Sequence, residues 1–185
     1  MGMEAHVTVI DRSLDRLKQL DEQFGSKLYT VYSTVDAIET LVVDAGLVIG
    51  AVLVPGAAAP KLVRRALLKR MRPGSVLVDI AIDQGGCFET SHATTHADPT
   101  YVVDGIIHYC VANMPGAVAR TSTFALNNAT LPFALALADN GWRRALAEDP
   151  HLRNGLNIHD GQVTYKPVAQ ALELKYVAAE QALGI

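Results

Sequence analysis

A carboxylate followed by two glycines stands at the end of an apolar run in the middle of the chain. Residues 76–82 are mostly apolar and β-branched, and Asp83, Gln84, Gly85 and Gly86 follow them. Such a run predicts a buried strand ending at Asp83, and open α/β sheets bind ligands where their strands end. The glycines allow a sharp turn and close approach of a ligand. Two interpretations of Asp83 stay open: a group that accepts and returns a proton, or a residue that only caps the turn.

A second acidic residue, Asp11, closes the short apolar segment 6–10. In dinucleotide-binding folds, an acidic residue that ends the second strand holds the ribose hydroxyls, about 20 residues beyond a G-x-G-x-x-G loop. Only ten residues precede Asp11, and they contain neither that loop nor a first strand. Either Asp11 is an ordinary strand-end aspartate, or the chain begins midway through a Rossmann domain. The second alternative predicts that a central strand is absent and that its neighbours keep apolar edges.

Cysteines and histidines do not predict a metal site. The chain has two cysteines, Cys87 and Cys110, which is too few for a disulfide framework and fits a reducing compartment. Their spacing relative to the six histidines is not that of a metal-binding motif. Neither has a basic neighbour in sequence that would activate it, so both are expected to be packed residues. His92 and His96 could bind a metal from one helix face, but the Ser- and Thr-rich segment around them does not predict a helix.

Composition indicates a globular protein with a substantial core. The chain has 185 residues, of which 50% are hydrophobic and 19% charged, and its net charge is −3. No basic stripe is present, so we expect no nucleic-acid partner. The most apolar long window, 124–138, is interrupted by asparagine, threonine and proline, and it is too short and too polar to span a bilayer. The N-terminus lacks the pattern of a signal peptide, so we predict a cytoplasmic protein without a membrane partner.

Predicted strands alternate with helices of roughly ten residues, the pattern of a doubly wound parallel sheet. The expected strands are 6–10, 28–32, 47–54, 76–82, 101–103 and 106–111, and the expected helices are 14–24, 35–44 and 61–71. Beyond Pro115 the pattern changes to helices at 121–138 and 166–182, with either a loop or a weak hairpin at 155–164. The helix at 121–138 is nearly all apolar and needs cover on all sides. The rest of the chain offers little to cover it.

Six runs of sequence resemble the alanine dehydrogenase family, which includes the NAD-binding subunit of proton-translocating transhydrogenase. These runs are residues 7–11, 45–56, 59–63, 76–89, 109–115 and 121–126. The likeness covers essentially the whole chain. The run at 78–89 is a highly specific signature, and it favours alanine dehydrogenase over the transhydrogenase.

This resemblance implies a two-domain fold of which the chain carries a part. Residues 1–119 would form a partial NAD(H)-binding Rossmann domain that lacks the first strand and the glycine-rich loop. Residues 120–185 would form the C-terminal helical part of the substrate domain. The fold class is thus α/β, an incomplete Rossmann-type parallel sheet followed by helices. The uncovered apolar helix is then explained, because its partners would belong to a preceding region. Family members form homo-oligomers, typically hexamers.

The implied activity is NAD-dependent, reversible oxidative deamination of L-alanine to pyruvate and ammonia. By resemblance, Asp83 is the catalytic acid/base group. Asp11 would hold the adenosine ribose, with Arg16 and Ser33 on the adenosine side. His92 stands where the family often has an arginine. The full set of implied cofactor contacts is Asp11, Arg16, Ser33, Val52, Leu53, Ile80, Ala81, Ile82, Asp83, His92, Val111, Ala112, Asn113 and Met114.

Two other function classes remain open. The chain could be a non-catalytic NAD-binding or assembly module, or it could resemble the NAD-binding domain of a transhydrogenase α-subunit. The family's glycine-rich loop, its substrate-holding arginine and lysine and its catalytic histidine would all lie in a preceding region. We therefore expect the isolated chain to have negligible turnover.

Overall fold

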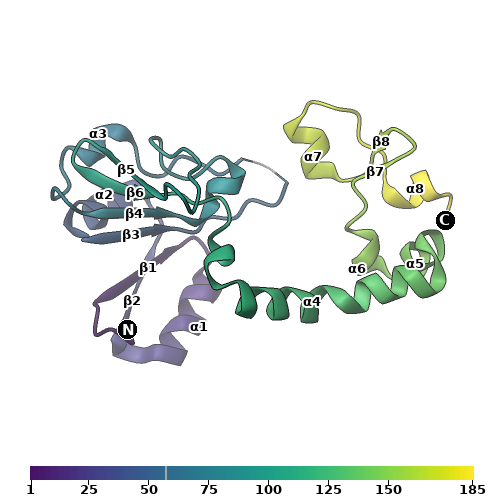
Figure 1. The fold of residues 1–185 in the computed structure, drawn as a ribbon, viewed down its shortest axis with the longest axis horizontal. Coiled ribbons are helices and arrows are strands. Elements are labelled where there is room, and N and C mark those ends of the chain that lie inside the picture. The colour runs from purple at the N-terminus through teal and green to yellow at the C-terminus, as the bar shows by residue number, and fades with distance from the viewer. Residues whose placement is uncertain (57) are drawn as a thin grey trace. The chain divides into compact units, whose positions relative to one another are not determined.

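Two compact units make up the chain in a computed structural model, which describes residues 1–56 and 58–185 (Figure 1). The first unit comprises residues 1–51 and 60–111, and the second comprises residues 52–59 and 112–185. Each unit is described by itself below. The expected domain division at 119/120 concerns the complete protein and stays a prediction.

The first unit begins with a strand–helix–strand segment. Strands β1 (Val7–Asp11) and β2 (Leu28–Tyr32) pair in parallel, and α1 (Leu14–Phe24) connects them through a short 3₁₀ turn, η1 (Gly25–Lys27). Helix α1 begins where predicted, because the Ser13 side chain accepts the amide hydrogen of Arg16. Thr34 caps α2 (Val35–Asp44) in the same way. These helix starts were predictable because a cap acts within one turn of chain.

A four-stranded sheet forms the rest of this unit. Its order is β3-β4-β6-β5, and the bounds are β3 Leu47–Gly50, β4 Val76–Asp79, β5 Thr100–Val103 and β6 Ile106–Tyr109. The first three are parallel, and β5 runs antiparallel along β6. Leu77, Phe88 and Ile106 are completely or almost completely buried around this sheet and form its core. The predicted α/β class with a parallel sheet is confirmed.

The parallel sheet is divided. Among the described residues, no ladder joins the β1–β2 pair to β3 or to any other strand of the four-stranded sheet. Leu47 and Ile49 of β3 are exposed. Exposed hydrophobic side chains are expected on a strand when some of the elements that pack against it are absent. This division agrees with the expectation of an incomplete sheet, and the absence of a central strand stays a prediction.

Three local predictions in the first unit were wrong. The strand expected to reach Asp83 ends at Asp79, and residues Ile80–Gln84 form a 3₁₀ helix, η2. The strand expected at 47–54 ends at Gly50. The helix expected at 61–71 is reduced to α3 (Arg65–Leu68), because the backbone before it bonds to residues 87–89 instead.

The second unit contains a long helix and a small helical cluster. Its elements are η3 (Met114–Val118), α4 (Ala119–Asn140), α5 (Trp142–Glu148), α6 (Pro150–Arg153), β7 (Ile158–His159), β8 (Gln162–Val163), α7 (Lys166–Ala171) and α8 (Ala179–Leu183). The long helix and the hairpin β7–β8 confirm predictions. The single helix expected at 166–182 was wrong. It is two helices, and Tyr176 between them makes a bridge to Val163 instead.

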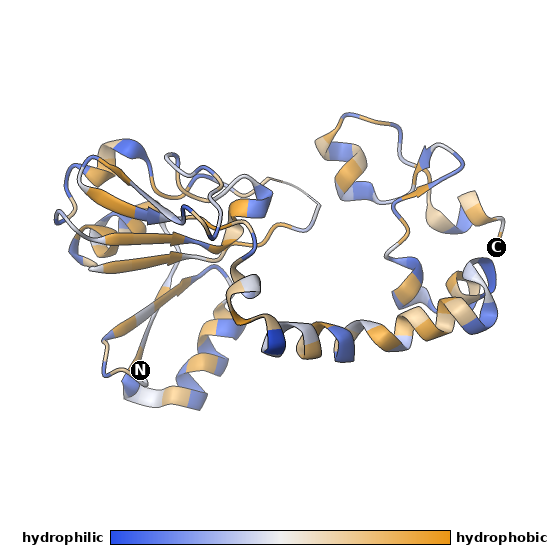
Figure 2. Ribbon diagram, viewed as in Figure 1, coloured by the Kyte–Doolittle hydropathy of each residue, from blue (hydrophilic) through white to orange (hydrophobic). Residues whose placement is uncertain are grey.

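Helix α4 is apolar and uncovered. It has no buried residue, and Phe124, Leu126 and Phe133 are among its exposed side chains. Figure 2 shows hydrophobic colouring over much of its length. No helix in the described part of the chain combines the length and hydropathy that crossing a bilayer requires. The predicted lack of cover for this helix is confirmed.

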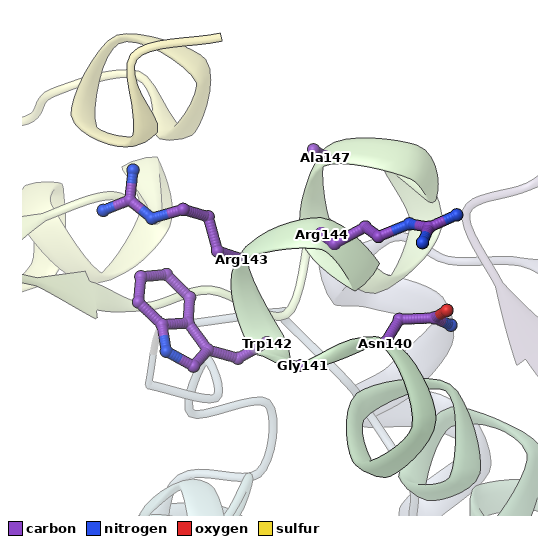
Figure 3. A pocket seen from close by; sticks show the side chains of 6 residues that line it. All are labelled: Asn140, Gly141, Trp142, Arg143, Arg144 and Ala147. Carbon is purple, nitrogen blue, oxygen red and sulfur yellow. The ribbon is translucent and has the colours of Figure 1, made fainter.

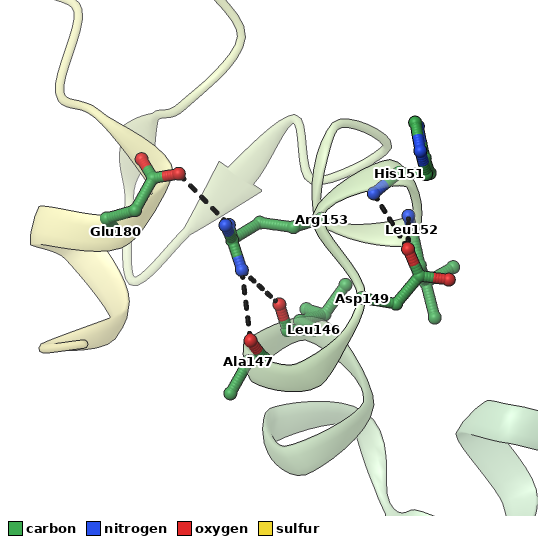
Figure 4. A network of polar contacts seen from close by, with 7 residues as sticks. All are labelled: Leu146, Ala147, Asp149, His151, Leu152, Arg153 and Glu180. Carbon is green, nitrogen blue, oxygen red and sulfur yellow. Dashed lines mark hydrogen bonds and ion pairs between the residues drawn. The ribbon is translucent and has the colours of Figure 1, made fainter.

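Arg153 links the helices of the cluster (Figure 4). Its Nη1 donates to the carbonyl oxygens of Leu146 at 2.9 Å and Ala147 at 3.1 Å, at the end of α5. Its Nε donates to Glu180 of α8 at 3.0 Å. Arg153 itself ends α6, whose first turn is capped by the Asp149 carboxylate. One largely buried guanidinium therefore connects α5, α6 and α8.

Candidate functional site

Three parallel strands end together in the first unit. Gly50, the last residue of β3, lies opposite Asp79, the last residue of β4, and Val78 lies opposite Tyr109, the last residue of β6. The chain therefore leaves β3, β4 and β6 at the same edge of the sheet, the edge where parallel α/β sheets bind ligands. The predicted cofactor residues 52–53, 80–83 and 111–114 follow these three strand ends in sequence.

Asp83 lies in η2, one turn beyond β4, and its carboxylate is exposed. The neighbouring Ile80 is also exposed, at 52%, whereas Ala81 and Ile82 are buried against the core. Of the four predicted residues on this turn, Ile80 and Asp83 thus offer their side chains to a ligand. The part played by Asp83 in proton transfer stays a prediction.

The carboxylate that does end the strand belongs to Asp79, and it is completely buried. Its Oδ1 accepts the amide hydrogen of Ala81 at 3.1 Å, and its Oδ2 accepts those of Cys87 at 2.9 Å and Phe88 at 3.3 Å. The Ser91 hydroxyl donates to the same Oδ2 at 2.5 Å. Sequence reasoning missed this residue. The available signal was a carboxylate inside an apolar run, which must find donors when buried.

The two glycines of the turn differ in their surroundings. Both have positive φ, +85° at Gly85 and +74° at Gly86, so both favour glycine. A Cβ on Gly86 would lie 2.7 Å from Asp79 Oδ2 and 2.7 Å from the Ser91 Cβ, whereas a Cβ on Gly85 would meet nothing within 4 Å. Lys61 Nζ donates to the carbonyl oxygens of both glycines, at 2.5 and 2.8 Å. The backbone after Asp83 is therefore held from two sides.

The segment 61–65 runs alongside residues 85–89. The Leu62 amide donates to the Cys87 carbonyl at 2.7 Å, and the Glu89 amide donates to the Val63 carbonyl at 2.9 Å. The Glu89 carboxylate accepts the Arg65 amide hydrogen at 2.6 Å. These bonds join the start of α3 to the chain that follows the turn, and they are the reason that residues 61–64 are not helical.

A buried polar chain lies beside this turn. The Tyr101 hydroxyl donates to the Thr90 carbonyl at 2.9 Å and lies 3.5 Å from Cys110 Sγ. Burial raises the pKa of the Tyr101 phenol and of the Cys110 thiol, so both stay protonated. Burial lowers the pKa of His108, whose Nδ1 lies 3.0 Å from the Ile106 carbonyl and whose Nε2 lies 2.7 Å from Thr90 Oγ1. These groups serve packing, as expected for the cysteine.

His92 lies on the surface of the same region. Its ring stacks on Tyr101, with the ring centroids 3.7 Å apart, and its amide donates to the Tyr101 hydroxyl oxygen at 3.0 Å. The predicted cofactor contact of His92 stays a prediction. Within residues 1–56 and 58–185, no three His, Cys, Asp or Glu side chains are grouped as ligands of a metal ion.

The predicted adenosine-side residues lie at the ends of β1 and β2. The Ser33 amide donates to the Asp11 carbonyl at 2.9 Å, which brings these two residues together. Asp11 Oδ1 accepts the Ser13 amide hydrogen at 2.8 Å. The Arg16 guanidinium bonds to Gln19 on its own helix instead of to Asp11. A partly exposed carboxylate beside a serine can accept hydrogen bonds from the hydroxyls of a ribose, so this corner fits the adenosine part of a dinucleotide.

The remaining predicted cofactor contacts that belong to the second unit are Val52, Leu53, Ala112, Asn113 and Met114. Val111 belongs to the first unit and is buried there. Leu53 is exposed, and Val52 is half-buried. The Asn113 side chain accepts the Gly116 amide hydrogen at 3.2 Å and so caps η3. Ala112 is exposed and Met114 is half-buried. The cofactor contacts assigned to these residues by resemblance stay predictions.

A separate hollow lies where α4 meets α5 (Figure 3). It is lined by Asn140, Gly141, Trp142, Arg143, Arg144 and Ala147. The Arg143 guanidinium carbon is 5.1 Å from the Trp142 ring centroid, and Arg143 also donates to the Leu183 carbonyl at 3.2 Å. Arg144 is paired with Glu148. The hollow contains none of the predicted site residues, and its two arginines already have partners.

Comparison with known proteins identifies the relatives of the chain. The family described as "Alanine dehydrogenase/PNT, C-terminal domain" matches residues 1–166. An alanine dehydrogenase from Halomonas elongata is 64% identical over 184 residues, and one from Mycolicibacterium smegmatis is 56% identical over 183 residues. These matches cover 100% and 99% of this chain but 50% and 49% of those proteins. The chain thus spans about half the length of its relatives.

Solved structures give the same result. An L-alanine dehydrogenase structure superposes with a TM-score of 0.81 at 49% identity, covering 93% of this chain and 47% of that one. A transhydrogenase from Sinorhizobium meliloti superposes with a TM-score of 0.62 at 21% identity, covering 88% of this chain and 50% of that one. At that identity the second likeness concerns the fold alone.

Proposed function

The chain belongs to the alanine dehydrogenase/PNT family, and we propose that it is the C-terminal half of an L-alanine dehydrogenase. The complete enzyme would catalyse the reversible oxidative deamination of L-alanine to pyruvate and ammonia. The observation that carries this proposal is the 64% identity to an alanine dehydrogenase along the entire chain. The turn bearing Asp83, Gly85 and Gly86 supports it, because this turn follows the ligand-side end of a parallel strand.

Membership of this family implies a pyridine nucleotide, and we propose that it is NAD. The support comes from Asp11, whose carboxylate stands at the end of β1 beside Ser33. A carboxylate at this place accepts hydrogen bonds from a ribose and repels the 2′-phosphate of NADP. NAD supplies a hydride acceptor when bound. Ile80, exposed beyond the end of β4, would offer an apolar surface to the nicotinamide ring.

Asp83 would move the proton at the amino or imino nitrogen of the substrate. Its carboxylate is exposed in this chain, and a general acid/base works best when it is enclosed and held within hydrogen-bond reach of the substrate. The missing half of the enzyme would have to supply that enclosure, together with the groups that bind the substrate carboxylate. Positioning and proton transfer would provide most of the rate enhancement.

Fusion to the missing half tests this function. The part of the Halomonas elongata enzyme that the chain does not match would be fused ahead of residue 1, and alanine-dependent NADH formation would be measured. We expect turnover from the fusion and negligible turnover from the 185 residues alone. A fusion that binds NADH yet never oxidises alanine, while the intact Halomonas enzyme does so under the same conditions, would overturn the proposal.

A second candidate function is a non-catalytic module that binds NAD or assists assembly, and the observation that favours it is that the chain spans about half the length of its relatives. Calorimetric titration of the isolated chain with NADH separates the two ideas when it is combined with the fusion assay. Binding by the chain without turnover in the fusion supports the module. Turnover in the fusion supports the enzyme.

The complete protein is proposed to be a homo-oligomer in the cytoplasm. The resemblance to a family whose members form homo-oligomers supports association. The two buried cysteine thiols fit a reducing compartment. Sedimentation of the fusion protein tests the first statement, and a monomer at micromolar concentration would contradict it.

A further inference from the structure

The two ends of the turn that carries Asp83 are tied to one buried group. Asp79 Oδ1 accepts the amide hydrogen of Ala81, two residues before Asp83. Asp79 Oδ2 accepts the amide hydrogens of Cys87 and Phe88, which follow the turn. A single carboxylate therefore closes a loop of backbone in which Asp83 is the exposed acidic residue.

The hydrogen bonds to the Asp79 carboxylate are of a kind that fixes the backbone geometry of the turn. The acceptor is a carboxylate with no exposed surface, and its donors are three peptide amides, the Ser91 hydroxyl and the Cys87 thiol, whose Sγ lies 3.5 Å from Oδ1. Hydrogen bonds to a charged group are about twice as strong as neutral ones, and a low dielectric strengthens them further. Both oxygens are used, so the carboxylate cannot rotate without losing donors on each side of the turn.

The packing around this carboxylate leaves little room for the turn to shift. Gly86 passes so close to Asp79 Oδ2 and the Ser91 side chain that no Cβ fits there. Lys61 holds the carbonyl oxygens of Gly85 and Gly86 from outside. Bonds from Leu62 and Val63 to the strand-like segment 87–89 fix the far end.

We propose that Asp79 is the positioning residue for Asp83, holding the η2 turn so that the exposed carboxylate meets the substrate nitrogen. This inference rests on the proposed function. Asp79 is buried and does not touch the reacting atoms, so it acts through Asp83. A misplacement of about 1 Å can cost about 100-fold in rate, which is the scale of effect expected when the tie is broken.

Asp79→Asn tests the tie in the complete fused enzyme. The amide has the size of the carboxylate, but its NH₂ group would face amide hydrogens whichever way it is oriented, at Ala81 or at Cys87 and Phe88. We expect kcat to fall about 10- to 100-fold, with KM for L-alanine changing less than about threefold. Hydrogen exchange of the Ala81, Cys87 and Phe88 amides is expected to accelerate. Ser75→Ala, at the opposite end of β4, is the control and should change neither quantity.

A double-mutant cycle separates positioning from general stability. In an Asp83→Asn background, Asp79→Asn should produce no further loss of the residual kcat, because the group being positioned is gone. An equal fold-loss in both backgrounds would mean that Asp79 acts independently of Asp83 and would overturn the proposal. If Asp79→Asn fails to fold, Ser91→Ala removes one donor and keeps the charge, and a smaller loss with the same cycle result is expected.

Hydrogen exchange tests the positioning role of Asp79 separately from the proposed function. An unsubstituted fusion that is inactive with alanine would overturn the function. The Asp79→Asn exchange result would still decide whether the carboxylate holds the turn. Unchanged exchange at Ala81, Cys87 and Phe88 would overturn the positioning role in either case.

Discussion

Asp79 and Asp83 are four residues apart, yet the Asp79 carboxylate is completely buried and the Asp83 carboxylate is exposed. The 3₁₀ helix that begins after Asp79 separates them, because it carries the chain out of the sheet before Asp83 is reached. The buried residue is used for structure and the exposed one is available for chemistry.

Gly86→Ala should destabilise the chain more than Gly85→Ala does. Both substitutions place a side chain at positive φ, which costs about 1–2 kcal/mol. Only the Gly86 substitution also clashes, with Asp79 and Ser91, and overpacking adds about 1–3 kcal/mol. Urea unfolding, monitored by hydrogen exchange of the β4 amides, measures the difference in unfolding free energy between the two variants. Equal losses for the two variants would contradict the packing described for Gly86.

His108 should make the first unit less stable as the pH falls. Burial lowers its pKa below the ordinary 6.5, so below pH 6.5 the unfolded chain binds a proton that the folded chain does not. This destabilisation by His108 is absent when the pH is above the pKa of histidine in the unfolded chain. Below that pKa it grows as the pH drops, by at most about 1.4 kcal/mol per pH unit.

A His108→Gln variant checks this linkage. The difference in unfolding free energy between the original chain and the variant should be constant above about pH 7 and should change between pH 6.5 and 5. Hydrogen exchange of β4 and β6 amides measures it within the first unit. A difference that does not vary over this pH range would show that His108 titrates alike in both states.

Cys87 and Cys110 should react with thiol reagents only when the first unit opens. Both are completely buried, and burial raises the pKa of Cys110, so little thiolate is present or reachable. We expect a native chain to react at least about 100-fold more slowly than a urea-unfolded one, in proportion to its open population. Rapid modification of the folded chain would count against the packed role assigned to both cysteines.

Arg153→Met should destabilise the second unit. The substitution keeps the apolar stem but removes hydrogen bonds from a largely buried guanidinium to Leu146, Ala147 and Glu180, at a cost of about 1–3 kcal/mol. Trp142 is the single tryptophan of the chain and lies in this unit, so its fluorescence follows the unfolding. Arg144→Met, which removes an exposed pair with Glu148, is the matched control and should have no measurable effect. Similar losses for both would refute the linking role of Arg153.

Local chemistry made several features predictable from the sequence. Ser13 and Thr34 cap helices that begin where expected, because a cap bonds only to amides within one turn. The hydrophobic runs predicted the parallel strands, and the residue types of 78–89 identified the family.

Contacts between distant residues decided the rest. Strand β4 stops at Asp79 because amides of residues 81, 87 and 88 converge on its carboxylate. Residues 61–64 are not helical because their backbone bonds to 87–89, and the C-terminal helix is split where Tyr176 bridges to Val163. Each of these also depends on partners that lie from 8 to 26 residues away along the chain, which residue periodicity does not encode. The sequence determined which elements form and which family they belong to, and the tertiary structure decided where each element ends and which aspartate is buried.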